Sequence, residues 1–204
     1  AIETDPTHVR ARLNRASIHM ASGNAQDALD DANVLLELAP GLALAKLRRA
    51  EANMMLTNWE AAKDDLEVII EDAPHHHHAL TQLAACYISM DRPEKAEAPL
   101  NEALRLAPDH TDAWHQRGLL YLDWGREEAA LNDFEAAVRC DGSHLDARLH
   151  IAAIHHEAKR FVEASGAWKG VLAIEPDHAV ARRRKEECEI CLLYTSDAAD
   201  DSGC

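Results

Sequence analysis

The sequence has 204 residues and a formal net charge of −15, with 47% hydrophobic and only 4% aromatic residues. This acidic balance argues against nucleic-acid binding, because phosphates require basic surfaces. No apolar run approaches the roughly 18 residues of a membrane-spanning helix, so no membrane contact is expected. No signal peptide is visible and the five cysteines show no disulfide spacing. We therefore expect a reducing compartment, the cytoplasm.

A 34-residue period organises the chain from its first residues onward. Prolines stand at positions 6, 40, 74 and 108, and Gly142 occupies the next step before Pro176 resumes the series. Alanine recurs at the same interval at positions 28, 62, 96, 130 and 164. A period held over so many steps indicates an array of similar structural units. We expect five repeats, at residues 9–42, 43–76, 77–110, 111–144 and 145–178, preceded by the end of another repeat at 1–8.

The fourth repeat shows most clearly what each unit is. Its sequence predicts two antiparallel helices, at about 111–124 and 127–140, because small and aromatic residues recur at helical spacing. Those residues are Trp114, Gly118, Tyr121, Ala130, Phe134 and Ala137. Gly125 falls in the turn, where a helix end commonly needs a left-handed residue. Together with the period, this pattern resembles the tetratricopeptide repeat (TPR) family.

The resemblance implies an all-α fold, a right-handed α-solenoid of antiparallel helix pairs. Each pair exposes an apolar face that only a neighbouring pair can cover, so the pairs must stack. The first helix of each pair is expected to line the concave side. Residues 179–190 are expected to begin a sixth repeat or to form a polar capping helix.

The last fourteen residues break both the composition and the period. Residues 191–204 read CLLYTSDAADDSGC, which resembles one translated frame of a sequencing-library adapter. We interpret this tail as non-native and exclude it from the reasoning about the fold; a genuine tail is the alternative. The non-native interpretation also removes the apparent CxxC pair of Cys188 and Cys191.

Two departures from the family pattern carry structural predictions. Arginines 15, 49 and 117 occur in the same repeats as aspartates 31, 65 and 133, whereas the other two repeats lack both residues. We predict an Arg–Asp pair between the two helices of each of these repeats, with bidentate geometry. Pro99 lies inside a predicted second helix and cannot donate to the carbonyl of Lys95, so it should bend or loosen that turn. Pro93 sits at a first helical position, where proline is favoured.

The resemblance places peptide binding on the concave face of the first helices. The candidate residues are Leu47, Arg48, Glu51, Met55, His78, Gln82, His115, Gln116 and His150. Met54 and Met55 offer an adaptable apolar lining, and packing against the neighbouring helix is an equal expectation for one of them. The lining of repeats 3 to 5 is polar and acidic and has no Lys or Arg. This favours a basic or neutral protein or peptide partner.

One subclass of the family grips the carboxylate ends of chaperone tails with Lys and Asn side chains. The corresponding positions here hold Leu13, Ser17, Arg48, His78 and Gln82. Because no Lys and no matching Asn is present, we do not expect a chaperone-tail carboxylate clamp.

The thirteen histidines suggest a metal site as one hypothesis. His75 to His78 form a run of four, and His-rich tracts can bind transition metals. A loop run has no fixed tetrahedral geometry, however, and no Cys or carboxylate completes it. We therefore expect adventitious binding at most, and neither a metal site nor a cofactor. Histidines in the groove leave open pH-sensitive binding, against the plainer interpretation of a polar surface.

No set of residues suggests catalysis. The sequence has no nucleophile–base–orienter combination, no Gly-rich phosphate loop and no HExxH motif. We predict a non-enzymatic scaffold that binds a peptide segment of another protein in its groove. One alternative is the partner-recognition region of a larger enzyme, such as a transferase. Another is a self-associating array in which terminal repeats stack on one another.

Overall fold

The computed structural model describes the backbone of residues 8–200 and the side chains of residues 8–193. The predicted end of a preceding repeat, except for His8, therefore lies outside the described residues, as do the last four residues of the predicted non-native tail. Over the described backbone the regular structure consists of eleven α-helices and one 3-10 turn, without a strand. This confirms the prediction of an all-α fold. The chain forms two compact units, Ala1–Pro108 and Asp109–Cys204, called unit 1 and unit 2 below.

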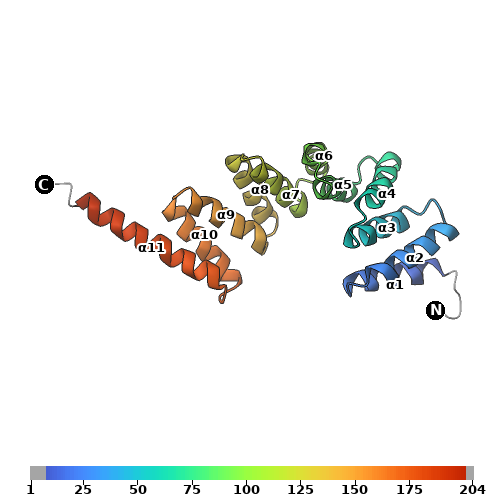
Figure 1. Ribbon diagram of the computed structural model, residues 1–204, viewed down its shortest axis with the longest axis horizontal. Coiled ribbons are helices and arrows are strands. Elements are labelled where there is room, and N and C mark those ends of the chain that lie inside the picture. Colours follow the sequence, from blue (N-terminus) through green and yellow to red (C-terminus); the bar gives the residue numbers. More distant parts are fainter. Residues whose placement is uncertain (1–7, 201–204) are drawn as a thin grey trace. The chain divides into compact units, whose positions relative to one another are not determined.

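Unit 1 is a row of helix pairs. Its elements are α1 (Val9–Ala21), α2 (Ala25–Leu38), α3 (Ala43–Met55), α4 (Trp59–Asp72), α5 (His77–Ser89), η1 (Pro93–Lys95) and α6 (Glu97–Leu106). Each helix packs against the next one along the chain (Figure 1). Leu47 of α3, Leu66 and Ile69 of α4, and Leu83 and Cys86 of α5 share one core cluster. The core therefore lies between pairs as well as within them, as expected for a solenoid.

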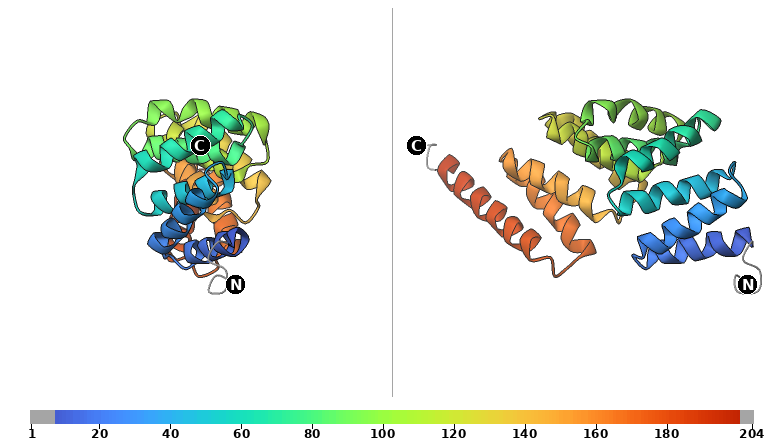
Figure 2. Two further views of the ribbon diagram at one scale, coloured as in Figure 1. Left: turned by 90° about the vertical axis from the view of Figure 1, so that its right-hand side faces the viewer. Right: turned by 45° about the vertical axis from the view of Figure 1, so that its right-hand side comes forward.

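Unit 2 continues the same construction. Its helices are α7 (Thr111–Asp123), α8 (Glu127–Cys140), α9 (Leu145–Glu157), α10 (Phe161–Ile174) and α11 (Ala179–Asp200). Helix α11 lies against α10, as Figure 1 and the right view of Figure 2 show, and buries Ala181 and Cys188 in a core cluster with Trp168. The helix runs unbroken into residues 191–200. The non-native origin of those residues stays a prediction.

The turns inside the helix pairs share one strained conformation. The odd-numbered helices begin at residues 9, 43, 77, 111, 145 and 179, so they too are 34 residues apart. Gly125 has a φ of 67°, which confirms the expected left-handed residue. The residues at the same place in the other pairs are Gly23, Thr57, Asp91 and Lys159, with φ between 57° and 76°. A positive φ favours glycine. Thr57, Asp91 and Lys159 adopt this conformation at some cost in free energy.

Close helix packing explains Gly118. The Phe134 side chain of α8 is fully buried. A Cβ atom on Gly118 of α7 would lie 2.7 Å from Phe134 Cε1, closer than any real contact. Glycine at this point thus leaves room for the ring, and α7 and α8 approach each other closely there.

All three predicted Arg–Asp pairs are present and bidentate. Arg15, Arg49 and Arg117 each donate from Nε to the paired aspartate at 2.7 Å and from Nη2 at 2.5 to 2.8 Å. The paired aspartates, at positions 31, 65 and 133, are 2 to 6% exposed. Burial of a carboxylate requires a partner of this kind. The pairs therefore join the two helices of a repeat.

Pro99 changes the start of its helix as predicted. The second helix of this pair begins with the 3-10 turn η1, which has Pro93 at its start, and α6 follows only at Glu97. The Ala96 N–H bonds to the Pro93 carbonyl at 3.0 Å, in a 3-10 pattern. The α-helix therefore begins only at Glu97, two residues before Pro99, which has no N–H to donate.

Candidate functional site

The predicted peptide-binding residues lie on the first helices of the pairs, and they divide between the two units. We call the face formed by α3 and α5 the A-helix surface of unit 1, and the face formed by α7, α9 and α11 the A-helix surface of unit 2. Six predicted residues belong to unit 1: Leu47, Arg48, Glu51, Met55, His78 and Gln82. The other three belong to unit 2: His115, Gln116 and His150.

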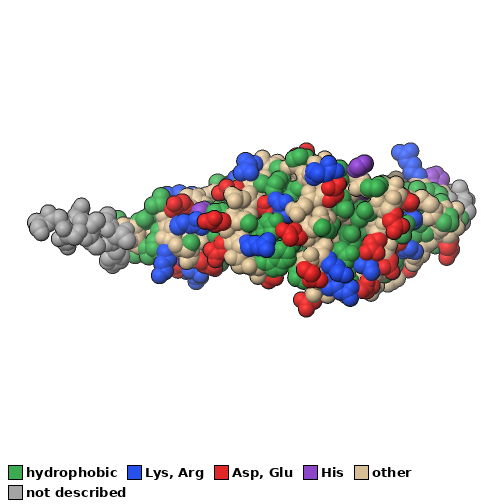
Figure 3. Space-filling model, turned by 90° about the horizontal axis from the view of Figure 1, so that it is seen from above, with side chains coloured by type: hydrophobic (Ala, Val, Ile, Leu, Met, Phe, Trp, Pro, Cys, Tyr) green, Lys and Arg blue, Asp and Glu red, His purple; other side chains and the backbone are tan. Residues whose placement is uncertain are grey.

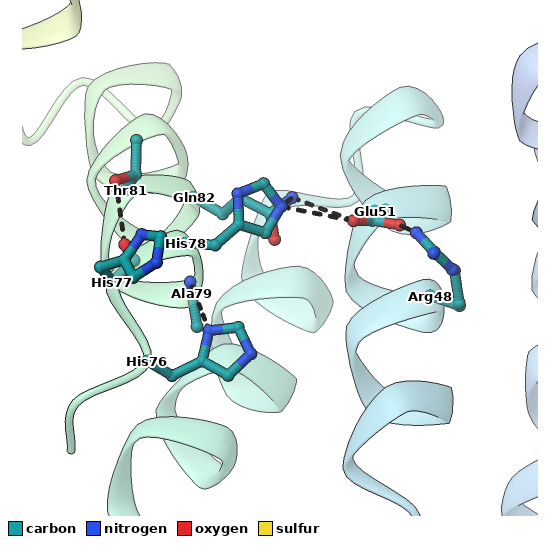
Figure 4. Close-up of polar contacts among 8 residues, drawn as sticks. All are labelled: Arg48, Glu51, His76, His77, His78, Ala79, Thr81 and Gln82. Carbon is teal, nitrogen blue, oxygen red and sulfur yellow. Dashed lines mark hydrogen bonds and ion pairs between the residues drawn. The ribbon is translucent and has the colours of Figure 1, made fainter. Parts of the chain in front are cut away.

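In unit 1, Glu51 links α3 to α5. These are two of the A helices, as we call the first helices of the pairs. Its carboxylate accepts hydrogen bonds from Arg48 Nη1 at 2.5 Å and from Gln82 Nε2 at 3.3 Å, and His78 Nε2 lies 3.6 Å away. Figure 4 shows Arg48 and Glu51 on α3 and, opposite them, His78 and Gln82 on α5. The Glu51 side chain is 14% exposed, so within this network it lies deeper in the surface than His78, which is 42% exposed.

The network fixes the charge of Glu51. Burial alone would raise the pKa of its carboxyl, but hydrogen bonds from His78 and Arg48 favour the carboxylate and bring the pKa below the ordinary glutamate value. Glu51 therefore stays ionised at neutral pH and neutralises Arg48. The positive charge of Arg48 is therefore already paired with a carboxylate of the same chain. The expectation that this position holds no carboxylate clamp stays a prediction.

The two methionines and Leu47 divide between the surface and the core. Met55 is 45% exposed, as an apolar lining residue should be, whereas Met54 packs against the core cluster. Leu47 is only 9% exposed and belongs to the same cluster. It supports the surface from beneath and offers a ligand little area. A rule based on repeat position could not distinguish these neighbours.

Residues 76, 77 and 78 of the histidine tract make separate contacts. His76 Nδ1 accepts from the Ala79 N–H at 3.1 Å, the His77 carbonyl accepts from Thr81 Oγ1 at 3.0 Å, and His78 faces Glu51. Figure 4 shows the three imidazoles apart from one another. In the part of the chain with described side chains, no three His, Cys, Asp or Glu residues are grouped so that they could hold a metal ion.

In unit 2 an aromatic stack links the A helices α7 and α9. The ring of His115 on α7 lies 5.6 Å from that of His150 on α9, 4.8 Å from His144 and 5.7 Å from Phe134. The rings of Phe134 and His150 are stacked at 4.8 Å. The sequence pointed to His115 and His150 separately, and the fold brings them together.

Burial keeps both imidazoles of this stack neutral. Burial lowers the pKa of His115, and the neighbouring imidazoles of His144 and His150 act in the same direction against Asp146 and Asp112. Burial also lowers the pKa of His150, with Asp146 opposing it. Neutral rings stack on Phe134 without the cost of burying a charge.

Several buried polar atoms of the predicted residues have no protein partner. Among the described residues, no hydrogen bond reaches Arg48 Nε, Gln82 Oε1, His115 Nε2 or Gln116 Oε1. Such atoms are unusual in folded proteins. These four are on residues that the sequence assigned to binding, and further atoms of this kind lie on residues outside that set, such as His155, Arg160 and Trp168.

Histidines also cap the helices, a role that the sequence analysis missed. The Nδ1 atoms of His8, His76, His144 and His178 each accept the backbone N–H three residues later, at 3.1 to 3.2 Å. Each therefore satisfies one free donor at the start of an A helix. The recurrence of histidine just before five of the six first helices of the described pairs, with Leu42 before the sixth, was the available signal, but Ser, Thr, Asp and Asn are the residues expected there.

Charges are mixed over the described surface. On the face shown in Figure 3, acidic and basic side chains alternate with hydrophobic ones, and no continuous basic patch is visible among the described residues. The A-helix surface of unit 2 gains a cation from α11, Arg184, which the acidic lining of the preceding repeats lacks. Over the described residues, no helix is both long enough and apolar enough to cross a membrane.

Comparisons with known proteins agree with this geometry. Three family profiles, each described as tetratricopeptide repeat, match residues 1–43, 44–76 and 83–149. No curated protein sequence gives a significant match.

Solved structures share the arrangement at low sequence identity. One is TTC0263, a thermophilic TPR protein of Thermus thermophilus, with 20% identity and a TM-score of 0.71 over 89% of this chain and 99% of that one. YrrB, described as a TPR protein with an unusual peptide-binding site, has 22% identity and a TM-score of 0.64 over 91% and 96%. MamA from Desulfovibrio magneticus has 16% identity and a TM-score of 0.70 over 84% and 97%. At these identities the likeness establishes the fold alone.

Proposed function

This chain belongs to the tetratricopeptide repeat family, and on that premise we propose that it is a non-enzymatic scaffold whose A-helix surfaces bind a peptide segment of another protein. Repeat proteins of this kind offer extended surfaces for binding. The description of YrrB as a TPR protein with a peptide-binding site makes the same use of this fold plausible here.

The Glu51 network is the observation that carries this proposal. It holds three side chains, Arg48, His78 and Gln82, in one arrangement across two helices. The side chains of Arg48 and His78 remain 29% and 42% exposed. A ligand would therefore meet polar groups that are already ordered, which reduces the entropy cost of binding.

We further propose that the partner segment is neutral or basic. Asp112, Asp123, Asp146 and Glu157 lie on the A helices of unit 2. Within unit 1, the cation Arg48 is neutralised by Glu51. An acidic segment would have to approach these carboxylates at a cost in free energy.

A selection from a random peptide library tests this function. The full chain would be used to select binders from phage-displayed peptides of about 12 residues, long enough to lie along several repeats. The Kd of the selected peptides would then be measured for the wild type and three variants. We expect Glu51→Gln to weaken the selected peptides by about tenfold or more, because loss of the charge releases Arg48 and His78 from their positions.

The matched control is Glu71→Gln, an exposed glutamate on α4 of the same repeat. It should leave Kd within about twofold, as surface substitutions usually do. If the selected peptides bind Glu51→Gln and a His150→Ala variant as tightly as the wild type, the A-helix surfaces are not the binding site.

We also propose a reducing compartment, the cytoplasm, for this chain. The support is that the four cysteines with described surroundings, at positions 86, 140, 188 and 191, are free thiols. Fractionation of cells that express the tagged protein tests the location directly.

A further inference from the structure

A small cavity opens on the A-helix surface of unit 2, between α9 and α11. It has a volume of about 190 Å³. Its walls are Ala153, His156 and Glu157 of α9, Trp168 of α10, and Val180 and Arg184 of α11. None of these belongs to the nine residues predicted to bind peptide. The cavity is large enough for one side chain of a ligand and too small for a drug-sized molecule.

Trp168 gives the cavity a buried hydrogen-bond donor. The residue is 4% exposed, and its indole N–H has no hydrogen-bond partner among the described residues. A buried indole N–H normally finds an acceptor, and leaving it without one has a cost in free energy. This wall of the cavity is therefore suited to an acceptor oxygen.

His156 and Arg184 form a second, ordered wall. Arg184 Nη1 lies 3.3 Å from His156 Nε2, and because arginine only donates, Nε2 must be the acceptor. The ring hydrogen is then on Nδ1, which faces Cys188 Sγ at 3.2 Å. Arg184 Nη1 also donates to Glu187 Oε2 at 3.0 Å. The guanidinium is thus held in place with donors to spare.

Glu157 supplies the complementary group. It is the last residue of α9, is exposed, and lines the same cavity. The cavity therefore combines two kinds of donor, Trp168 and Arg184, with one carboxylate acceptor, while Ala153 and Val180 add apolar walls. One positive and one negative charge leave the lining electrically balanced.

We propose that this cavity is the anchor pocket for one primary-amide side chain, glutamine or asparagine, of the peptide that binds the A-helix surface. The proposal rests on the proposed peptide-binding function. The amide oxygen accepts from Trp168 and Arg184, and the amide nitrogen donates to Glu157. A carboxylate side chain meets Glu157 and an ammonium side chain meets Arg184, so each is disfavoured by a like charge.

Capped amino acids probe this pocket without knowledge of the partner. N-acetyl-glutamine N-methylamide, its glutamate analogue and its methionine analogue share a backbone without a primary amide and differ only in the side chain. The ¹H–¹⁵N spectrum of the full chain contains the indole signals of four tryptophans, and Trp168→Phe assigns the signal of Trp168. We expect the glutamine probe to shift this signal with a Kd of about 1–10 mM, a range set by its size. The other two probes should bind at least about tenfold more weakly.

A charge variant provides a second, more specific readout. Glu157→Gln removes the only acidic group of the lining on an exposed helix end, so it should fold normally and should remove the advantage of the glutamine probe over the glutamate probe, whereas Arg184 stays paired with Glu187. Glu128→Gln, an exposed glutamate on α8, should leave the order unchanged. Equal affinity for all three probes, or a Trp168 signal that none of them moves, would overturn the proposal.

The two proposals can fail separately. If library-selected peptides depend on Glu51 but show no preference for glutamine or asparagine and tolerate Trp168→Phe, the scaffold function stands and the pocket does not. If the glutamine probe binds at Trp168 but no peptide depends on Glu51 or His150, the pocket stands and the wider binding surface does not.

Discussion

Unit 1 and unit 2 join neighbouring A helices by different chemistry. Between α3 and α5 the link is a charged network around Glu51, whereas between α7 and α9 it is a stack of His115, His150 and Phe134. Both links belong to the same 34-residue helix-pair design. The difference teaches that the repeat backbone does not depend on one kind of lining. The lining residues are therefore available to determine what is bound.

The largest expected difference between the units concerns the Arg–Asp pairs. In unit 2, Asp133 is 4% exposed and accepts two hydrogen bonds from Arg117. In unit 1, Asp31 is bonded to Arg15 and also accepts from Arg12 at 2.9 Å. We expect Arg117→Met to destabilise its repeat by about 3 kcal/mol, since it removes the charge partner of a buried carboxylate. Arg15→Met should cost about 1 kcal/mol, because Arg12 remains.

Hydrogen exchange of the α1–α2 and α7–α8 segments measures these local free energies. An Arg117→Met, Asp133→Leu double variant should recover most of the loss, because replacing both partners removes the unpaired charge. Equal effects of the two arginine substitutions would show that Arg12 does not support Asp31.

The second difference concerns helix packing. Unit 2 has Gly118 against Phe134, whereas the corresponding residues in repeat 2 of unit 1 are Ala50 and Leu66, both fully buried. Gly118→Ala should destabilise unit 2 by about 2 kcal/mol, because the new methyl group overlaps the ring. Adding Phe134→Leu reproduces the Ala and Leu combination of unit 1 and should restore part of the stability, because leucine is smaller than the ring that it replaces.

Urea denaturation followed by circular dichroism measures the packing effect. Gly142→Ala is the control in the same unit, since nothing lies within 4 Å of the added atom. A Gly118→Ala protein as stable as the Gly142→Ala protein would contradict the close approach of α7 and α8.

The smallest difference should appear on acidification. His115 and His150 have lowered pKa values in the fold, so the unfolded chain binds protons first, near the ordinary value of about 6.5. Their contribution to stability is complete above that pH and declines as pH falls from it toward the lowered values. Glu51, also lowered, keeps its contribution down to about pH 4.3 and loses it as pH falls through its folded value.

We therefore expect His150→Gln to reduce the loss of stability between about pH 7 and pH 5.5, the range in which an ordinary histidine titrates, and Glu51→Gln to leave that loss unchanged. Hydrogen exchange of the α7–α9 segment is measured in increasing urea at both pH values. The urea concentration at which the segment opens gives the comparison. A larger response of the Glu51 variant in this range would reverse the assignment.

The sequence predicted the framework better than the surface. Regular spacing was enough for the helix pairs, and the joint occurrence of arginine and aspartate was enough for their ion pairs, because both follow from contacts inside one repeat. Pro99 acted through its own backbone. The state of Arg48 depended on Glu51 and on residues of the next repeat, so position alone could not reveal that its charge is neutralised.

The amide-sized cavity was also beyond the sequence. It requires residues of α9, α10 and α11 together, and the deciding observation is a missing acceptor for Trp168 among the residues that the structure describes. Repeat position marks Trp168 only as core. Absence of a partner is a property of three-dimensional surroundings and has no signal in spacing.

The capping histidines divide the array into separately fastened units. Each of His8, His76, His144 and His178 accepts a backbone N–H of the helix that it precedes and of no other helix. The loss of one cap should therefore loosen one helix start and leave the other capped starts of the array as they were.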